Sequence, residues 1–169
     1  MYRSREEFVK RLMIIGAKGV TEKMAQAQRQ QQVVERFIEA LKRLENDRDV
    51  ETMAALYAVD GEIGNVVAPD KFHGPDGARE FWTKYRETFG EVSSSFRNRL
   101  IADGGAALEW TTTGTTAGGT PFKYDGVSIL EFDGDHITRF QAYFNAEDLS
   151  RQIVEATQPA AQKAAGVDQ

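Results

Sequence analysis

The sequence predicts an α+β domain in which helices come first and a curled antiparallel sheet follows and wraps around them. Up to about residue 89, apolar residues recur at spacings of three and four, which is typical of amphipathic helices. Beyond Gly90 the chain changes to β-rich runs separated by turns at residues 103–104, 118–119 and 133–134. The 169 residues, 28% charged and 41% hydrophobic, are typical of a single domain with a core and a terminal extension.

The first 49 residues predict two helices. The apolar residues of the first helix share one face: Phe8, Leu12 and Ile15. We expect Gly16 and Gly19 to break this helix and Thr21 to cap the second. The second helix carries the strongest apolar stripe of the chain, made by Val33, Phe37, Leu41 and Leu44.

Two more helices are expected before the sheet. One starts near residue 48, has Met53 and Tyr57 on its apolar side and ends before the Asp60-Gly61 pair. The other begins at Pro75 and Asp76. Its inward face consists of aromatic residues: Phe81, Trp82, Tyr85 and Phe89.

The remaining chain predicts a meander of about four antiparallel strands. A fifth short strand, residues 62–67, would join the edge of this sheet. We divide the chain into an N-terminal helical extension (1–29), the domain itself (30–153) and a flexible C-terminal tail (154–169), which is rich in Ala and Gln.

Composition excludes several classes of protein. The net charge of -5 and the pI near 5.2 disfavour a nucleic-acid partner, which requires clustered Lys and Arg. There is no cysteine, and the two histidines lie far apart in the sequence, so we expect neither a metal site nor a cofactor. No apolar run is long enough to span a bilayer, which predicts a soluble, cytoplasmic protein without a membrane partner.

From about Gln30 to Ile153 the chain resembles the nuclear transport factor 2-like superfamily, in its SnoaL-like branch. The segments that carry the resemblance are FIEALKRLENDRDVETMAALYAVDGEI, FHGPDGAREFW, ALEWTTTGTTAGGTPFKYDGVSILEF and DGDHITRFQAYFN. This branch also contains ketosteroid isomerase, polyketide cyclases and limonene epoxide hydrolase. The resemblance implies a cystatin-like cone that encloses a deep pocket and that commonly dimerises through the outer sheet face, but one scaffold hosts many functions.

The positions that match the catalytic residues of ketosteroid isomerase are changed in this sequence. The tyrosine of that family falls on Phe37, its base on Asn65, and its second aspartate near Ser128. Phe37 has no proton to donate, and Asn65 cannot accept one at neutral pH. The resemblance therefore does not imply isomerase chemistry.

The catalytic Asp-Arg-Asp arrangement of limonene epoxide hydrolase is missing too. Its strand Arg and Asp fall near Trp110 and Thr112, and its remaining Asp falls near Ala142. A slip of one residue would turn Glu109 inward instead. SnoaL-type cyclases use one acidic residue in this sheet region as a base. In this sequence three acidic residues could take that role, but only if the strand register is shifted: Glu109, Asp125 or Asp60.

Alternation in residues 137–144 places Phe140 on one face and Gln141 and Tyr143 on the other. The family register turns the Phe140 face toward the cone. The residues expected to line the pocket, with core packing as the alternative role of the tryptophans, are Phe37, Trp82, Trp110, Ser128 and Phe140. The outer face carries Val127, Ile129 and Tyr143, which predicts a homodimer through that face.

Three residues are candidates for catalysis: His73, Asn65 and Glu109. His73 lies in the loop at the rim of the cone and is the best acid or base near neutral pH, while Asn65 has an alternative role in satisfying neighbouring backbone groups. Two functions stay open. The protein binds a small hydrophobic molecule, or it is an acid–base enzyme acting on a polyketide-, steroid- or terpenoid-like substrate.

Overall fold

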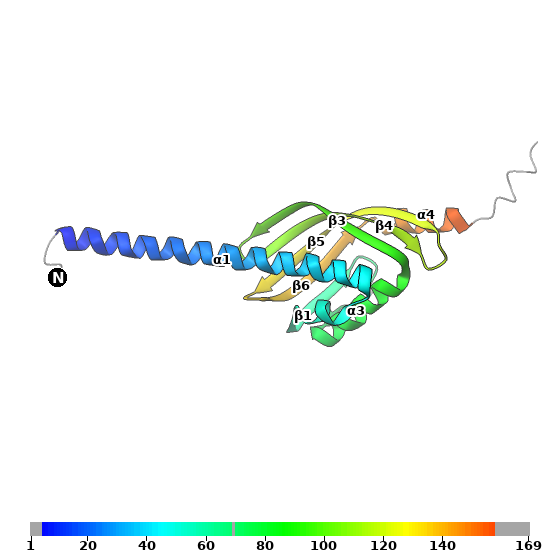
Figure 1. The fold of residues 1–169 in the computed structure, drawn as a ribbon, viewed down its shortest axis with the longest axis horizontal. Coiled ribbons are helices and arrows are strands. Elements are labelled where there is room, and N and C mark those ends of the chain that lie inside the picture. The colour runs from blue at the N-terminus through cyan, green and yellow to red at the C-terminus, as the bar shows by residue number, and fades with distance from the viewer. Residues whose placement is uncertain (1–4, 69, 158–169) are drawn as a thin grey trace, which may run out of the picture.

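The computed structural model describes residues 5–68 and 70–157 and shows helices packed on one six-stranded, strongly curved sheet. Figure 1 shows the first helix crossing one face of the sheet and extending well beyond it. The helices are α1 (Arg5–Asp47), α2 (Val50–Ala54), α3 (Gly74–Thr88) and α4 (Ala146–Thr157). The strands are β1 (Tyr57–Asn65), β2 (Phe72–His73), β3 (Phe89–Ala102), β4 (Gly105–Thr116), β5 (Pro121–Asp133) and β6 (His136–Phe144).

The sheet has the order β2-β1-β6-β5-β4-β3. Strands β3 to β6 form the predicted antiparallel meander, and Gly104, Gly119 and Gly134 take positive φ angles in its turns. Strand β1 instead pairs in parallel with β6, so the sheet is mixed at this edge. The α+β cone expected from the resemblance is confirmed.

Helix α1 is one uninterrupted helix, so the predicted break at Gly16 and Gly19 is wrong. A glycine inside a helix costs only about 1 kcal/mol relative to alanine, and no proline follows to end the helix. The helix ends at Asp47, where Arg48 adopts a left-handed φ of 60° and its N–H donates to the Leu44 carbonyl. The helix thus runs straight through the predicted boundary at residue 30.

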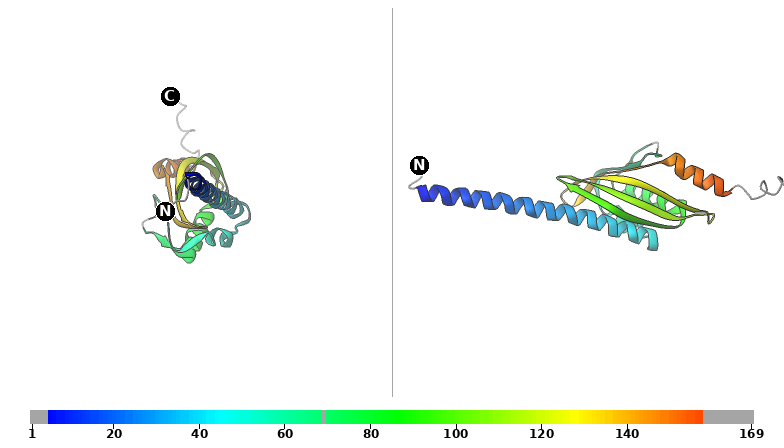
Figure 2. Two further views of the ribbon diagram at one scale, coloured as in Figure 1. Left: turned by 90° about the vertical axis from the view of Figure 1, so that its left-hand side faces the viewer. Right: turned by 90° about the horizontal axis from the view of Figure 1, so that it is seen from above.

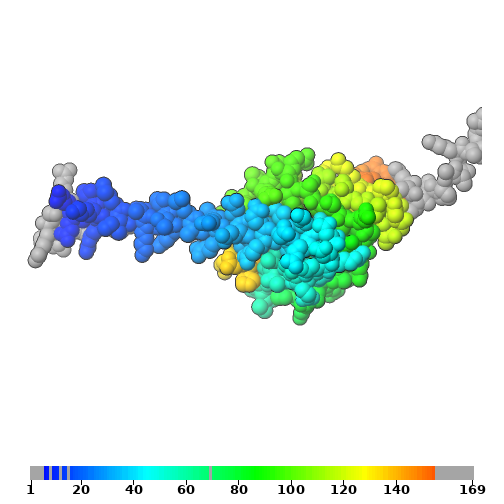
Figure 3. Space-filling view, viewed as in Figure 1, coloured from blue at the N-terminus to red at the C-terminus, as the bar shows by residue number. Residues whose placement is uncertain are grey.

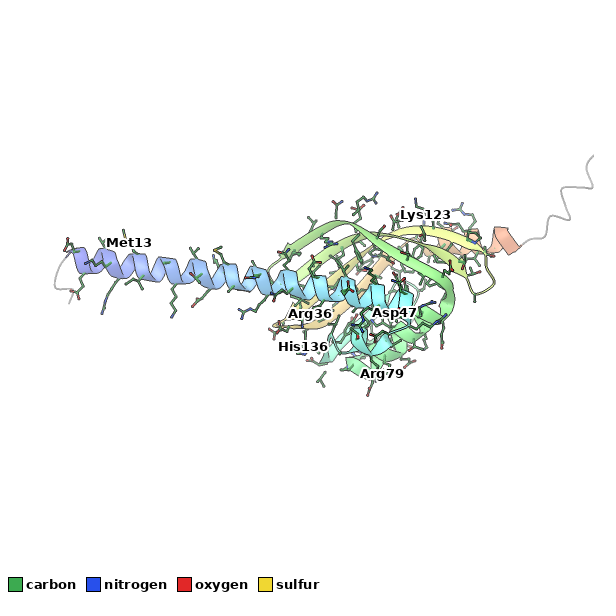
Figure 4. All side chains as sticks on the ribbon, viewed as in Figure 1. Met13, Arg36, Asp47, Arg79, Lys123 and His136 are labelled. Carbon is green, nitrogen blue, oxygen red and sulfur yellow. The ribbon has the colours of Figure 1, made fainter. Side chains whose placement is uncertain are left out.

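The two ends of α1 have different surroundings. The predicted stripe packs against the domain, and Phe37 and Leu44 are almost completely buried. The N-terminal part projects away from the sheet, as Figures 2 and 3 show. Met13, labelled in Figure 4, is 69% exposed there. The side chains of Phe8, Leu12 and Ile15 lie outside the part of the chain that the structure describes.

The third predicted helix is shorter than expected. Asp49 caps α2 by accepting a hydrogen bond from the Thr52 N–H at 3.0 Å, but the helix ends at Ala54. Residues 57–59, expected to be helical, begin strand β1. Tyr57 is buried, pairs with Ile137 of β6, and accepts a hydrogen bond from the Trp82 indole at 3.1 Å. Pairing with the sheet overrides the local helical pattern.

Helix α4 was not predicted: its first residues, 146–153, were given no element, and residues 154–157 were assigned to the tail. Asn145 starts it by accepting a hydrogen bond from the Asp148 N–H at 3.0 Å. The side chain of Gln152 then makes two hydrogen bonds to the backbone of Lys123 in β5, at 3.0 and 2.8 Å. These bonds hold α4 against the sheet. Residues 158–169 of the predicted tail lie outside the described residues.

The predicted strand register is observed. Phe140 is buried beneath the helices, and Tyr143 lies on the outer face at 46% exposure. Gln141 also lies on the outer side of β6, but it is buried because Lys71 covers it and donates a hydrogen bond to its side chain. In the described part of the chain, no helix is sufficiently long and apolar to span a membrane.

Candidate ligand-binding cavity

The concave face of the sheet and helices α1, α3 and α4 enclose a cavity of about 730 Å³. One wall of this cavity, which we name the aromatic wall, consists of Phe37, Phe81, Trp82 and Phe140. The ring centroids of Phe37 and Phe140 are 5.5 Å apart, and those of Trp82 and Phe140 are 5.1 Å apart. Tilted ring pairs at such distances stabilise the fold by more than the burial of their apolar area alone.

Trp110 lies further along the sheet and also lines the cavity. Its indole N–H donates to the Ser128 hydroxyl at 2.9 Å, and both residues are buried. Gly126 pairs directly with Trp110 across β4 and β5, and a Cβ at Gly126 would collide with the indole ring. The absence of a side chain at Gly126 therefore allows the indole its position.

A second wall is polar. This polar wall consists of Glu45 together with Tyr85, Ser94, Thr112 and Tyr124, and the last four line the cavity directly. Glu45 is only 5% exposed. Its carboxylate accepts hydrogen bonds from the Tyr85 hydroxyl at 2.9 Å, the Ser94 hydroxyl at 2.6 Å and the Ser94 N–H at 2.9 Å. The Ser94 and Thr112 hydroxyls are 2.7 Å apart. A buried carboxylate needs such partners to offset its lost hydration.

Both tyrosines of the polar wall stay protonated at neutral pH. Burial raises the pKa of Tyr85 well above its ordinary value, and the negative charge of Glu45 raises it further. Burial also raises the pKa of Tyr124 to about 12, against a smaller lowering by its hydrogen bond to Thr112. Neither hydroxyl is therefore suited to act as a base.

At the cavity mouth, Asn65 is partly committed to its own loop. Its side-chain oxygen accepts hydrogen bonds from the N–H groups of Val67 at 2.9 Å and Ala68 at 2.8 Å. Charged side chains surround this mouth: Asp70, Lys71, Glu80 and Lys84. Asn65 therefore shapes the rim, which was the alternative role considered for it.

The family model of the SnoaL-like domain matches residues 34–140, which contain all residues of both walls, and α4 lies beyond the match. The chain belongs to the SnoaL-like family. Within this SnoaL-like protein, the matched region begins where α1 meets the sheet and ends at Phe140.

Solved structures share the fold of this SnoaL-like protein at low sequence identity. An NTF2-like protein of unknown function from Burkholderia pseudomallei has a TM-score of 0.66 and 18% identity over 74% of this chain and 97% of its own. An LEH-like epoxide hydrolase from M. tuberculosis has a TM-score of 0.57 and 20% identity over 74% and 89%. A hypothetical protein with a ketosteroid isomerase-like fold from Catenulispora acidiphila, in complex with trimethylamine, has a TM-score of 0.62 and 18% identity over 69% and 90%. No curated protein sequence matches the chain.

The structure brings the five predicted ligand-binding residues together and leaves two of the predicted catalytic residues outside. Phe37, Trp82, Trp110, Ser128 and Phe140 all line the cavity. His73 does not line it; the residue is exposed, and its side chain makes no capping bond at the start of α3. Glu109 lies on the outer sheet face, where it pairs with Arg97 at 2.6 Å and accepts a hydrogen bond from Asn98.

The acids that a shifted register would have turned inward are also outside. Asp60 is exposed on β1, and Asp125 is exposed on β5 and accepts a hydrogen bond from Thr111. Because Trp110 faces the cavity, its neighbours in β4 face the other way. Among the described residues, no group of three or more acidic or histidine side chains is arranged to hold a metal ion.

Sequence reasoning missed the polar wall. Glu45 stands in the polar run KRLEND, where a carboxylate usually faces solvent. It nevertheless follows Leu41 by four residues, as Leu41 follows Phe37, so it lies on the buried face of α1. That spacing was the available signal. Ser94 and Thr112 stand within the runs SSS and TTT, in which alternation cannot distinguish inward from outward positions.

Proposed function

We propose that this SnoaL-like protein binds a small, mostly apolar molecule in the cavity between its sheet and helices. The observation that carries the proposal is a cavity of about 730 Å³ lined mostly by aromatic and other apolar side chains. Cavities of this size and composition are typical of small-molecule sites. Water beside the aromatic wall has few polar partners, so an apolar ligand displaces it at little cost.

The related structures support a small molecule as the ligand class. The Catenulispora acidiphila protein was crystallised with trimethylamine, and the M. tuberculosis protein is an epoxide hydrolase. At 20% identity or less, these proteins share the fold, while their activities depend on residues that each scaffold carries separately.

Acid–base catalysis on a polyketide-, steroid- or terpenoid-like substrate is the second candidate, and the buried carboxylate of Glu45 is the observation that favours it. The Glu45 oxygens already accept three hydrogen bonds, and the adjacent tyrosines are held in their protonated forms. This arrangement suits the positioning of a ligand better than the removal of a proton. Binding is therefore the function that we put first.

Titration with ethylnaphthalene, an uncharged apolar probe with its own fluorescence, tests the proposal. We expect Trp110→Ala to weaken binding by about tenfold or more, because the indole supplies buried contact area. The matched control is His73→Ala, which removes an exposed side chain outside the cavity and should leave the affinity unchanged. Circular dichroism of both variants checks the fold.

Two results would contradict the proposal. Failure of the wild-type protein to bind the probe would show that the cavity does not accept apolar molecules. A loss of turnover of a polyketide-, steroid- or terpenoid-like compound on Glu45→Gln, with probe binding retained, would support the enzyme instead.

We further propose that the protein is a cytoplasmic homodimer that associates through the outer sheet face. Tyr143 is 46% exposed there, and Val127 and Ile129 beside it are half-buried. A sheet face with this apolar character is a surface that a second copy would cover. Sedimentation at micromolar concentration should show a dimer, and a monomer would contradict this part of the proposal.

A further inference from the structure

The N-terminal part of α1 is basic, whereas the rest of the protein is acidic. We name residues 5–29 of α1 the arm and the remainder of the described chain the body. The arm carries six Lys or Arg residues and three Glu residues, a net charge of +3. Since the whole chain carries -5, everything outside the arm carries -8. Figures 2 and 3 show the arm extending away from the body, so its positive charge is presented apart from the acidic part of the chain.

An apolar stripe runs along the arm. It consists of Val9, Met13, Val20 and Met24, which follow one another at spacings of four, seven and four residues. At 3.6 residues per turn, these spacings keep all four residues within about 60° of one helix face. Their side chains are between 41% and 69% exposed. The stripe is therefore an apolar surface that the described part of the chain leaves largely in contact with water.

The stripe and the body lie on different sides of α1. Phe37, which packs against the body, follows Met13 by 24 residues, or about six and two-thirds turns. The stripe is thus rotated by about a third of a turn from the helix face that contacts the body. Because of this rotation, the body does not cover the stripe.

Lysines border the stripe on both sides. By the same helix geometry, Lys10 lies about 70° from the centre of the stripe in one direction and Lys23 about 70° in the other. Both side chains are exposed. Glu22 lies on nearly the opposite face of the arm, and Glu6, which is in line with the stripe, stands in the first turn of the helix. An apolar face bordered by basic residues is typical of helices that lie on lipid surfaces.

We propose that the arm lies on a lipid surface of negative charge, with the stripe among the acyl chains and Lys10 and Lys23 at the headgroups. Charge favours this partner over the arm of a second copy, since two arms of +3 repel each other. The stripe also spans only about two heptads, which is short for a coiled coil. The expectation that the protein has no membrane partner rested on the lack of a spanning segment, and a helix in the lipid interface needs none.

The acidic body does not cancel this attraction. Gln26 and Gln30 donate hydrogen bonds to Asp103, where the arm joins the body. Met13 lies 13 residues before Gln26, which is about 20 Å along the helix. Salt screens interactions between exposed charges beyond about 8 Å at physiological ionic strength. The outer half of the arm is therefore attracted by the lipid charge while the charge of the body is largely screened.

Co-sedimentation of the full chain with vesicles tests the proposal. One set of vesicles consists of phosphatidylcholine, and the other contains phosphatidylserine as well. We expect the protein to bind the anionic vesicles about tenfold more tightly than the neutral ones, and to lose this preference as the salt concentration is raised. Absence of binding to both, or equal binding to both, would overturn the proposal.

Met13→Gln combined with Met24→Gln removes the two most exposed members of the stripe without a change in charge. This variant should bind anionic vesicles about tenfold more weakly, because it has less apolar area to bury. The matched control is Leu100→Gln, which removes an apolar side chain of the body that is 71% exposed and should leave binding unchanged. Circular dichroism checks that both variants keep their helices. Unchanged binding of the methionine variant would contradict the role of the stripe.

Lys10→Gln combined with Lys23→Gln tests the contribution of charge. Each lysine close to an anionic surface contributes about fivefold to binding, so the loss should be tenfold or more. Lys42→Gln is the control, because it makes the same change at an exposed position of α1 beside the body. Sedimentation of the wild type and the methionine variant without vesicles completes the test. A smaller assembly of the variant would show that a second copy covers the stripe and would overturn the proposal.

Discussion

The two walls of the cavity come from the same helices but differ in their chemistry. On α1, Phe37 belongs to the aromatic wall, and Glu45, two turns later, belongs to the polar wall. On α3, Trp82 and Tyr85 divide in the same way over one turn. The aromatic wall stabilises through buried apolar area, and this hydrophobic contribution does not depend on direction. Each hydrogen bond of the polar wall, in contrast, needs a donor and an acceptor in the right orientation. For the proposed ligand, the aromatic wall would supply contact area and the polar wall would supply hydrogen bonds that orient it.

This difference predicts different responses to substitution. An aromatic side chain that is removed leaves a void whose cost grows with its volume. A polar side chain that is removed leaves its partner buried without a hydrogen bond, at a smaller cost in stability but with a change in what the cavity can bind.

Phe37→Ala should lower the free energy of unfolding by about 3–5 kcal/mol. The ring is 1% exposed and contacts both Trp82 and Phe140, with centroids 6.1 and 5.5 Å away. Urea denaturation measures this loss. Phe37→Leu is the control, and it should recover most of the stability because it refills much of the volume. A loss below about 1 kcal/mol in Phe37→Ala would show that the aromatic wall collapses to fill the void.

Tyr124 makes the stability of the polar wall dependent on pH. Its pKa is raised from 10.0 to about 12 in the folded protein, so its contribution is complete below about pH 10 and is lost as the pH rises toward 12. Two pKa units correspond to about 3 kcal/mol at most. We expect Tyr124→Phe to lose less stability than the wild type between these pH values in denaturation experiments. Parallel curves for the two proteins would contradict the raised pKa.

Ser128→Ala should have the smallest effect, about 1–2 kcal/mol in the free energy of unfolding. It leaves the buried indole N–H of Trp110 without the acceptor that now lies 2.9 Å away. Ser95→Ala is a suitable control, because that serine is exposed and makes only a long bond of 3.4 Å to a carbonyl. An equal effect of both substitutions would mean that water replaces Ser128 as the partner of Trp110.

Local patterns predicted most of the aromatic wall. The stripe containing Phe37 and Leu41 and the alternation around Phe140 each place apolar side chains on one face, and burial follows from that alone. The same reasoning was wrong at Gly16 and Gly19, where the small helix penalty of glycine was interpreted as the end of a helix. It was also wrong at Tyr57, where pairing with β6 decided the conformation.

The sequence by itself determined the change from helices to a meander and the register of that meander, because both depend on periodicity over a few neighbouring residues. The quoted segments carried the resemblance to the SnoaL-like family. Only the tertiary structure decided the polar wall. Glu45 meets Tyr85 and Ser94 from 40 and 49 residues away, and no local pattern specifies these meetings. The folded structure also placed His73 outside the cavity, whereas the predicted register had already turned Glu109 outward. The position of a buried polar side chain depends on the hydrogen-bond partners that the folded chain brings to it. Apolar side chains are buried by the hydrophobic effect, which needs no specific partner.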